Sequence, residues 1–597
     1  MNDLDYGALA DVIERDDAFA DGDLNSFAPP DSFSSPVPPQ GSESEDETLA
    51  ECAMLDHSDT DNARRLIKYF PNRILIMQAA GVSGGDKLIW SGRHWDIDNG
   101  EAGAALLAQQ VGDYIQREVD HMVATDFEKK LIEAGLAADV ELDELKALDP
   151  KAVTDDQRKK MKELSEAVAA GKAAKAALAS RKASHRKFGV TSKNATRIRA
   201  MLECAAPRLR KPIEEFNASA LSVATLTHTI KFHQEIDMEC PDPDVTRFTS
   251  RIEAVEGHRQ DDYITALVPV KYDEEAKAPL FRAWIEKMMP DPEARRTLQQ
   301  YSGVSLLGVP LQRFMFHYGE GANGKSVYLE MLVRLLGKSF AVGLPTESII
   351  GQGDRGAGSA SPDLIRLFGK RMVRVLELPE GKPLQSELIK KLTGGEEIPV
   401  RTLFKGFIDF MPRAKPHMSG NGLPKITDTS NGIWRRMLFL RWPVMIAEAD
   451  MRDPEVMVSE FLSESSGVLN WLCEGALDFL KNGLYIAPSV AHDVREYRKE
   501  MDIVMQFVED CVEKAPGESV QARVMYDAFK EWCGANSKSA VFETRFGRDM
   551  KRHCQRDDSS RLRKYVDVKL REDRPRWSEA TKSAVPPVES DDDTVPM

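Results

Sequence analysis

Cysteine is scarce in this sequence and is never arranged in pairs. Seven cysteines occur among 597 residues, and no CxxC motif is present. They are Cys52, Cys204, Cys240, Cys473, Cys511, Cys533 and Cys554. This spacing argues against a zinc ribbon and against a disulfide framework, so we expect a reducing, cytoplasmic compartment.

Long apolar runs are missing as well. No stretch reaches the ~18–20 apolar residues that a membrane-spanning helix needs, and no basic patch followed by an apolar run marks a secretory signal at the N-terminus. Hydrophobic residues make up 42% of the chain and charged residues 29%, which is ordinary for globular proteins. These features exclude a collagenous, wholly disordered or membrane-embedded chain, and we expect no membrane partner.

The net charge of −16 comes from the two ends of the chain. The first 60 residues contain sixteen Asp or Glu and a single basic residue, Arg15, and the final ESDDDTVPM contains four acidic residues. The remainder is nearly neutral. Binding to nucleic acid is therefore not excluded, because local patches decide it rather than the total charge.

Composition divides the chain into five segments: 1–56, 57–300, 301–485, 488–577 and 578–597. Both terminal segments are acidic and predict disordered tails; the N-terminal one either keeps the chain soluble or docks a partner. We expect 57–300 to be mixed and mainly helical, with a charged helical insertion at 125–186 that is either simply solvated or touches nucleic acid. Short apolar runs alternate with helical patterns at 301–445, which is typical of a parallel α/β sheet.

The most informative segment is a glycine-rich loop between an apolar run and a helical pattern. Phe314 to Tyr318 predicts a buried strand, and a helical period begins at Val327. Between them the sequence matches G-x-x-x-x-G-K-[ST], which predicts an ATP-binding loop rather than an ordinary glycine-rich turn. Its residues are Gly319, Glu320, Gly321, Ala322, Asn323, Gly324, Lys325 and Ser326.

The residue types in this loop suit a polyphosphate. Glycines let backbone N–H groups curve around phosphate, and the N-terminus of the following helix adds unpaired donors and a favourable dipole. We expect Lys325 to reach the β- and γ-phosphates and Ser326 to ligate Mg²⁺.

A carboxylate follows the next predicted strand. In RMVRVLELPEG, Met372 to Leu376 predicts a strand, and Glu377 lies at its carboxyl end, where ligands gather in open α/β sheets. Glu380 follows one short turn later. We expect one of the two to hold Mg²⁺ through water or to polarise the attacking water; the alternative is an ordinary surface glutamate.

Several motifs together resemble a known family. GEGANGKS, RMVRVLELPEG, LIKKLTGGEEIPVRTLFKGFIDFMP, SGNGLPKI and GIWRRMLFLRWP occur in the order found in superfamily 3 helicases. The sequence is most similar to the helicase part of phage and plasmid primase–helicases, which are related to the poxvirus primase–helicase. The similarity covers about residues 190–570. It implies a multi-domain α/β fold: an AAA+-like phosphate-loop core, a mainly helical N-terminal region and a C-terminal winged-helix-like domain.

The resemblance also implies roles for three further residues. Asn421 stands where the family has its polar sensor, which positions the attacking water or contacts the γ-phosphate. Arg435 and Arg436 match the arginine-finger segment, which would act on the nucleotide of a neighbouring copy in a homo-hexamer. Without the resemblance, the arginine pair would be interpreted as a salt bridge at the sheet edge. Pro416 interrupts the run before Asn421, and we expect that strand to start at His417.

Two basic regions are candidates for DNA binding. GGEEIPVRTLFKGFIDF predicts a β-hairpin, which in the resembling helicases projects into the central channel. Lysine and arginine grip backbone phosphate without reading sequence. The candidates are Arg401 and Lys405 in the hairpin, Lys390 and Lys391 before it, and Arg548, Lys551 and Arg552 near the C-terminus.

These observations lead to one expectation about function. The sequence predicts an ATP- and Mg²⁺-dependent DNA helicase that replicates a phage, prophage or plasmid in the cytoplasm of a bacterial host, on single-stranded or forked DNA. No primase catalytic domain is evident, so we expect a separate primase or another replication protein as partner. The alternatives are an initiator or loader ATPase that melts or marks origin DNA without processive unwinding, and a bifunctional primase–helicase.

Overall fold

A computed structural model describes most of the chain. The described ranges are 43–78, 85–149, 153–238, 246–351, 362–402, 406–426, 428, 430–559 and 562–574. The chain divides into two compact units, one formed by residues 1–71 and 105–207 and the other by 72–104 and 208–597. The region predicted at 57–300 thus contributes to both units. No helix in the described ranges is long and apolar enough to cross a membrane.

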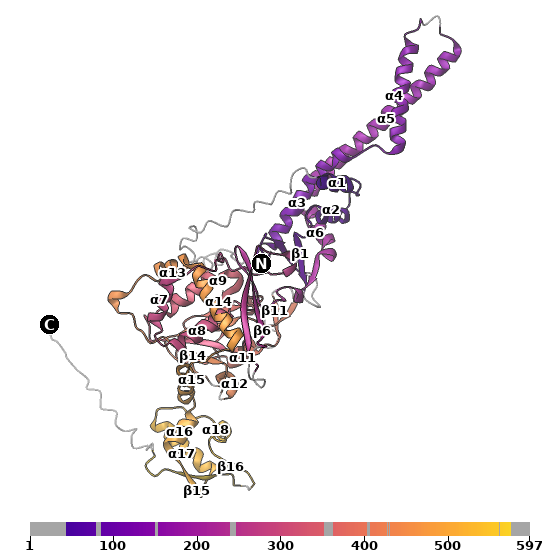
Figure 1. Ribbon diagram of the computed structural model, residues 1–597. Coiled ribbons are helices and arrows are strands. Elements are labelled where there is room, and N and C mark those ends of the chain that lie inside the picture. Colours follow the sequence, from indigo (N-terminus) through magenta and orange to yellow (C-terminus); the bar gives the residue numbers. More distant parts are fainter. Residues whose placement is uncertain are drawn as a thin grey trace, which may run out of the picture. The chain divides into compact units, whose positions relative to one another are not determined.

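The first unit is built from helices. They are α1 (Glu43–Cys52), α2 (Asp59–Tyr69), α3 (Gly100–Glu118, which begins in the other unit), α4 (Asp126–Lys146), α5 (Asp155–Ser192) and α6 (Ala195–Leu209). The helices α4 and α5 run side by side as a long hairpin, which we call the arm (Figure 1). Capping boxes at Thr125 and Thr154 satisfy backbone donors at the start of both arm helices.

Glycines bring α5 against its two neighbours. A Cβ on Gly135 of α4 would lie 2.9 Å from the Cα of Gly171 on α5. A Cβ on Gly112 of α3 would lie 2.6 Å from the carbonyl oxygen of Gly189, also on α5. No side chain fits at these crossings, so the backbones approach more closely than ordinary helix packing allows.

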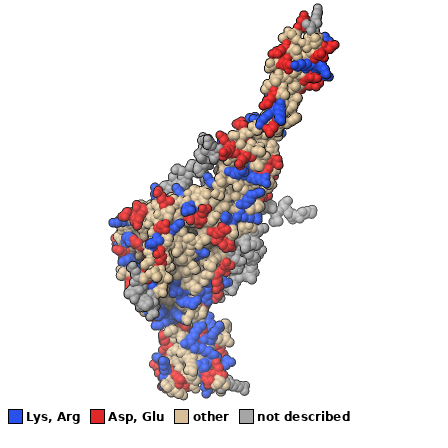
Figure 2. Space-filling model, turned by 45° about the vertical axis from the view of Figure 1, so that its right-hand side comes forward, with Lys and Arg blue, Asp and Glu red and all other residues tan. Residues whose placement is uncertain are grey.

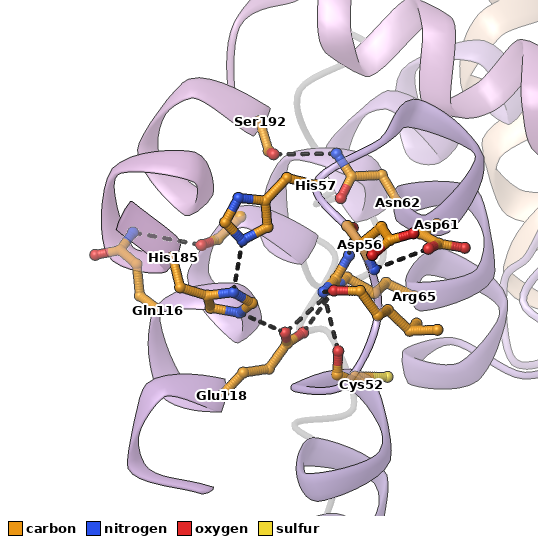
Figure 3. A network of polar contacts seen from close by, with 12 residues as sticks. Cys52, Asp56, His57, Asp61, Asn62, Arg65, Gln116, Glu118, His185 and Ser192 are labelled. Atoms are coloured by element: carbon orange, nitrogen blue, oxygen red, sulfur yellow. Dashed lines mark hydrogen bonds and ion pairs between the residues drawn. The ribbon is translucent and has the colours of Figure 1, made fainter. Parts of the chain in front are cut away.

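A buried polar network joins α2, α3 and α5 (Figure 3). The fully buried Glu118 accepts a hydrogen bond of 3.0 Å from Nε of Arg65 and one of 2.6 Å from the hydroxyl of Tyr69. Nε2 of His185 lies 2.8 Å from the same carboxylate, and Nδ1 of His185 lies 2.8 Å from Nε2 of His57. Burial pushes the pKa of Glu118 upward, but His185 and Arg65 hold it below its usual value.

The expectation of a disordered tail over residues 1–56 is wrong at its C-terminal end. Residues 43–52 form α1, in which Leu49 and Cys52 are buried. The carbonyl oxygen of Cys52 also accepts a hydrogen bond from the Arg65 guanidinium. Tertiary contacts therefore order an acidic segment whose composition alone predicts disorder. Residues 1–42 and the tail at 578–597 lie outside the described ranges.

A five-stranded parallel sheet forms the centre of the second unit, as the alternating pattern at 301–445 predicts. Its strand order is β14-β8-β13-β10-β9. The strands are β8 (Phe314–Tyr318), β9 (Ala341–Gly343), β10 (Met372–Val375), β13 (Lys415–Gly420) and β14 (Met437–Arg441). All six residues of β13 are buried, which fits a central strand covered on both faces.

Helices flank this sheet and connect its strands. They are α7 (Pro279–Met288), α8 (Pro292–Val304), α9 (Lys325–Phe340), α10 (Pro362–Ile365), α11 (Ser386–Gly394), α12 (Asn431–Trp434), α13 (Pro454–Ser463), α14 (Ser465–Asn482) and α15 (Pro488–Met501). Gly337 interrupts α9 with φ 73° and ψ 168°. The predicted hairpin is present, as β11 (Ile398–Thr402) pairs antiparallel with β12 (Gly406–Phe410).

Two small sheets precede the central sheet in the chain. The first contains β1 (Ile74–Gln78), β2 (Asp86–Trp90), β3 (Trp95–Asp96) and β4 (Arg210–Pro212). The second contains β5 (Ser222–Ala224), β6 (His228–Ile236) and β7 (Phe248–Glu256). The sequence predicts this part of the chain as mixed, without resolving the sheets.

The C-terminal module combines helices with a short antiparallel sheet. Its elements are α16 (Ile503–Cys511), β15 (Val512–Gln521), α17 (Ala522–Ala535), α18 (Glu543–Met550), β16 (Arg556–Asp557) and β17 (Lys564–Leu570). Phe507, Phe529, Trp532 and Phe546 form its buried core. Most aromatic residues of this module are therefore core residues, whereas Phe542 is exposed.

Candidate functional site

Three neighbouring parallel strands place the candidate residues at one edge of the central sheet. The glycine-rich loop starts directly after β8, Asn421 follows β13, and Glu377 lies two residues beyond β10. Because β8, β13 and β10 are adjacent and parallel, their carboxyl ends meet at this edge. Ligands of open α/β sheets bind at such edges.

The loop adopts a conformation that few side chains tolerate. Gly321, Ala322 and Gly324 have positive φ values of 112°, 46° and 80°. Gly324 caps α9, and a Cβ at this position would lie 2.6 Å from the ring of Trp284. The carbonyl oxygen of Ala322 accepts a 2.7 Å hydrogen bond from the N–H of Ile446. Glycine is thus required both for the φ angle and for space.

Lys325 points back into the loop and binds oxygen atoms there. Its Nζ donates to the carbonyl oxygen of Gly319 at 3.0 Å, to Oδ1 of Asn323 at 3.3 Å and to Oδ1 of Asn421 at 2.5 Å. Burial lowers the pKa of the ammonium group, while the nearby Glu377 acts in the opposite direction. The structure therefore brings Lys325, Asn421 and Glu377 into one electrostatic environment.

Three side chains with oxygen atoms that could ligate a cation are exposed at this edge. Glu377, Glu380 and Ser326 are exposed. Glu377 also has a φ of 55°, which is uncommon for a residue with a side chain and often marks a functional position. No group of three or more His, Cys, Asp or Glu residues able to hold a metal occurs in the described part of the chain. A cation here would therefore need further oxygen ligands from phosphate or water.

The arginine pair lies at the other edge of the sheet. Arg435 and Arg436 precede β14, whose first residue pairs with Phe314, whereas the loop follows Tyr318 at the far end of β8. Arg435 is exposed, and Arg436 is buried and donates to the carbonyl oxygen of Gly432 at 2.7 Å. The structure thus separates these arginines from Lys325 of the same chain by the length of one strand.

A third arginine joins this pair, which the sequence did not suggest. The guanidinium of Arg313 donates to the carbonyl oxygen of Arg435. Burial, together with the positive charges of Arg435 and Arg436, lowers the pKa of Arg313. The position of Arg313 just before β8 could have suggested this contact, because β8 and β14 start at the same sheet edge.

Some of the DNA-binding candidates are already held in ion pairs, and others are exposed. Lys390 is held by Glu387 at 3.0 Å and by Asp428 at 2.5 Å. Lys551 pairs with Asp558 at 2.8 Å, and Arg552 with Asp549 at 3.4 Å. Lys391 and Arg548 are exposed. Lys405 and the side chain of Arg401 lie outside the described residues.

Sequence reasoning missed a hollow of about 180 Å³ beside the loop. It is lined by the loop residues Gly319, Glu320, Gly321 and Asn323, by Arg441 at the end of β14, and by the segment from Trp442 to Met445. This segment follows β14 directly and so reaches the same sheet edge as the loop. The order of the strands, which the sequence does not give, decides that it lies there.

Trp442, which lines this hollow, contacts the first of two buried histidines. Nε1 of Trp442 donates to Nδ1 of His317 at 3.1 Å, so the His317 proton sits on Nε2, 3.2 Å from Nδ1 of His417. Nε2 of His417 can in turn donate to the hydroxyl of Ser305 at 3.4 Å. Burial lowers the pKa of His317 far below its usual value and that of His417 to about 3. Both rings are therefore neutral near pH 7.

Comparison with protein families now adds independent information. Residues 63–290 match the family described as D5 N terminal like, and residues 499–575 match the family described as poxvirus D5 protein-like. Through these two matches the chain resembles D5-like primase–helicases on both sides of the central sheet. The glycine-rich loop lies between the two matched ranges, so its roles rest on the motif and on the geometry above.

Individual relatives are viral proteins. The chain is 28% identical over 272 residues to "Putative helicase 022R" of Frog virus 3 (isolate Goorha), covering 43% of this chain and 28% of the relative. It is 27% identical over 301 residues to "Putative helicase L207/L206" of Acanthamoeba polyphaga mimivirus, covering 46% and 31%. The matched region thus spans less than a third of these relatives.

A remote structural neighbour is the C-terminal region of NrS-1 (residues 305–718), with 9% identity and a TM-score of 0.33, covering 56% of this chain and 96% of that one.

Proposed function

We propose that this protein is an ATP-dependent DNA helicase of the superfamily 3 type, serving replication of a phage, prophage or plasmid. The observation that carries the proposal is the convergence of the loop, Lys325, Asn421 and Glu377 at the carboxyl edge of three adjacent parallel strands. The strand order β14-β8-β13-β10-β9 is compatible with the AAA+-like core that the sequence motifs imply.

The residues at this edge of the sheet fit a nucleoside triphosphate. Lys325 already binds neutral oxygen atoms of Gly319 and Asn421, and phosphate oxygens, which carry charge, are stronger acceptors for an ammonium group. The N-terminus of α9 provides further unpaired donors. Asn421 is placed to hold either Lys325 or an oxygen of the reacting phosphate or water.

The same edge has the oxygen donors that Mg²⁺ requires. Ser326 and one of the exposed carboxylates, Glu377 or Glu380, would hold the ion. Bound Mg²⁺ supplies charge neutralisation at the phosphate oxygens. The chain's own contribution is to orient the phosphates through the loop and to place Glu377 where it can accept a proton from water.

Hydrolysis is proposed to need a second copy of the chain. Arg435 and Arg436 lie at the sheet edge opposite to Lys325, so they cannot reach a nucleotide held by their own loop. In a ring, each copy would present its arginines to the nucleotide of the next one and stabilise charge that develops in phosphoryl transfer. We propose a homo-hexamer, the assembly expected from the resemblance.

DNA would be held through the hairpin and the C-terminal module. The hairpin formed by β11 and β12 contains Arg401, and Lys391 lies on the preceding helix. The visible face of the C-terminal module has a broad group of Lys and Arg side chains (Figure 2). The helices and short antiparallel sheet of this module support a winged-helix-like fold, in which Arg548 on α18 is exposed. Priming would fall to a separate partner protein.

The relatives named as helicases support the activity but not the bacterial setting. They come from viruses of a frog and of an amoeba. The phage or plasmid context and the bacterial cytoplasm therefore rest on the resemblance of the motifs.

The test compares ATP hydrolysis and strand separation in the full chain with two lysine variants of α9. Lys325→Ala should lose both activities, whereas Lys338→Ala, which removes an exposed lysine of the same helix, should keep both. ATP hydrolysis by wild type should rise when single-stranded DNA is added. Residual unwinding by Lys325→Ala would contradict the site assignment. Hydrolysis without processive unwinding would favour the initiator or loader, and primer synthesis by the purified chain would favour a bifunctional primase–helicase.

A further inference from the structure

A long stretch that covers the second half of α5 and the start of α6 contains charge of one sign. Residues 167–202 contain nine Lys or Arg and no Asp or Glu, in a chain whose net charge is −16. The nine are Lys172, Lys175, Arg181, Lys182, Arg186, Lys187, Lys193, Arg197 and Arg199. Mutual repulsion makes such a stretch unfavourable in isolation, so its partners are informative.

Only three of these cations have a carboxylate partner among the described residues. Arg181 pairs with Glu128, Lys193 with Asp113 and Arg197 with Asp59. The other six form no ion pair within the parts of the chain that the structure describes, and most of them are exposed. Their charges are therefore available to an external anion.

Four of the unpaired cations lie on one side of α5. Lys172, Lys175, Lys182 and Arg186 fall within about 80° of the helix circumference at 100° per residue, over a length of about 21 Å. We call these four residues the α5 stripe. Figure 2 shows Lys and Arg side chains on the visible face of the arm, together with Asp and Glu side chains.

The side chains between these cations indicate whether the partner is a membrane, a protein or a nucleic acid. Ala173, Ala176, Ala179, Ser180 and Ala183 are exposed and small. A helix lying in a membrane interface needs a bulky apolar face, and protein interfaces are usually anchored by aromatic residues; this part of α5 has neither. A phosphate backbone needs only a line of cations and close approach.

The C-terminal part of α5 is packed against neighbouring helices. His185 contacts Glu118 at 2.8 Å (Figure 3), and Gly189 packs directly on Gly112. Both contacts fix the helix within a few residues of Arg186. Cations on such a support lose little conformational freedom when they bind.

From these observations we propose that the α5 stripe binds the phosphate backbone of nucleic acid, independently of base sequence. This surface lies within the helical insertion at 125–186, for which the sequence left nucleic-acid contact open, and is separate from the individual DNA-binding candidates above, which all follow residue 389. The binding needs no nucleotide, so it does not depend on the proposed motor function.

The test measures binding of the full chain, without ATP, to labelled single-stranded and duplex oligonucleotides of unrelated sequence over a range of salt concentrations. The variant K172Q/K175Q/K182Q/R186Q should bind more weakly, and the slope of log K against log salt should fall by about 3, since each contact contributes about 0.7 to 0.9. The control R158Q/K159Q/K160Q/K162Q removes four charges from the far end of the same helix and should leave the slope unchanged. Helical circular dichroism shows whether both variants remain folded.

Three outcomes would overturn the proposal. An unchanged slope in the stripe variant would mean that these residues make no phosphate contact. Equal losses in both variants would mean a general charge effect. Polyglutamate that competes as well as DNA of equal charge would reassign the stripe to an acidic protein. Lys325→Ala should still bind through the stripe, so loss of ATP hydrolysis and loss of this binding remain distinguishable.

Discussion

Nζ of Lys325 lies 2.5 Å from Oδ1 of Asn421, although the two residues are 96 positions apart in the chain. The contact joins the loop after β8 to the end of the neighbouring strand β13. A phosphate that binds at Lys325 therefore changes the partners of Asn421. At the proposed nucleotide site, this coupling would make the contacts of Asn421 depend on whether a nucleotide is bound.

Asn421→Ala should separate binding from hydrolysis. The variant leaves the loop and the charge of Lys325 in place, so we expect nucleotide affinity to change by less than about tenfold. The rate of hydrolysis should fall by about 10² or more, as on removal of a donor that stabilises a transition state. Binding of a fluorescent ATP analogue and steady-state phosphate release measure the two quantities. A variant with wild-type turnover would exclude Asn421 from the reaction.

Mixing two inactive variants tests whether the site is shared between copies. Lys325→Ala damages the loop, and Arg435→Ala damages the opposite sheet edge. If the arginine acts on a neighbouring copy, mixed assemblies contain some interfaces with an intact Lys325 and an intact Arg435. We expect phosphate release to recover partially on mixing. Full activity of Arg435→Ala by itself, or no recovery in assemblies shown to be mixed, would contradict the shared site.

Breaking the buried Arg65–Glu118 ion pair should lower the free energy of unfolding strongly. Glu118→Gln leaves the fully buried Arg65 without its counter-charge, which typically costs about 3–5 kcal/mol. The double variant Arg65→Met/Glu118→Leu removes both charges, and we expect it to lose clearly less than Glu118→Gln. Urea unfolding followed by circular dichroism measures the differences. Equal losses would show that the pair's electrostatic balance is unimportant for this unit.

The lowered pKa of the buried His417 predicts that the free energy of unfolding depends on pH. Its pKa in the folded protein is about 3, below the value of about 6.5 in an unfolded chain. Between these values the unfolded state binds more protons, so the free energy of unfolding falls as pH drops below about 6.5, by at most about 1.4 kcal/mol per pH unit from this group. His417→Gln removes this contribution. Its stability deficit relative to wild type should therefore shrink between pH 7 and pH 5 in parallel urea titrations.

The strand, the glycine-rich loop and the helix from Phe314 onward could be predicted because their signals are local. Apolar runs, glycines and a helical period lie next to one another in the sequence. Pro416 is a partial case. The sequence predicts a strand from His417, whereas β13 starts at Lys415; its pairing with β8, however, begins only at His417. Pro416 is therefore paired with Val373 of β10 but precedes the ladder with β8.

Features that depend on distant contacts could not be predicted. The helix α1 is acidic and becomes ordered through Leu49, Cys52 and the bond from Arg65. The buried Arg371 and Lys415 illustrate the same limit, because they donate to the carbonyl oxygens of Leu306 and Leu307 just beyond α8. Nothing near these cations in the sequence reveals their acceptors. Likewise, the hollow beside the loop required the strand order.

The two glycine crossings of α5 have a consequence for how the arm can vary in length. Gly171 and Gly189 are 18 residues apart, which is five complete turns of an α-helix. Both therefore face the same direction. Inserting 18 residues between them would lengthen α5 by about 27 Å without rotating one crossing relative to the other, whereas inserting nine residues would turn them to opposite sides.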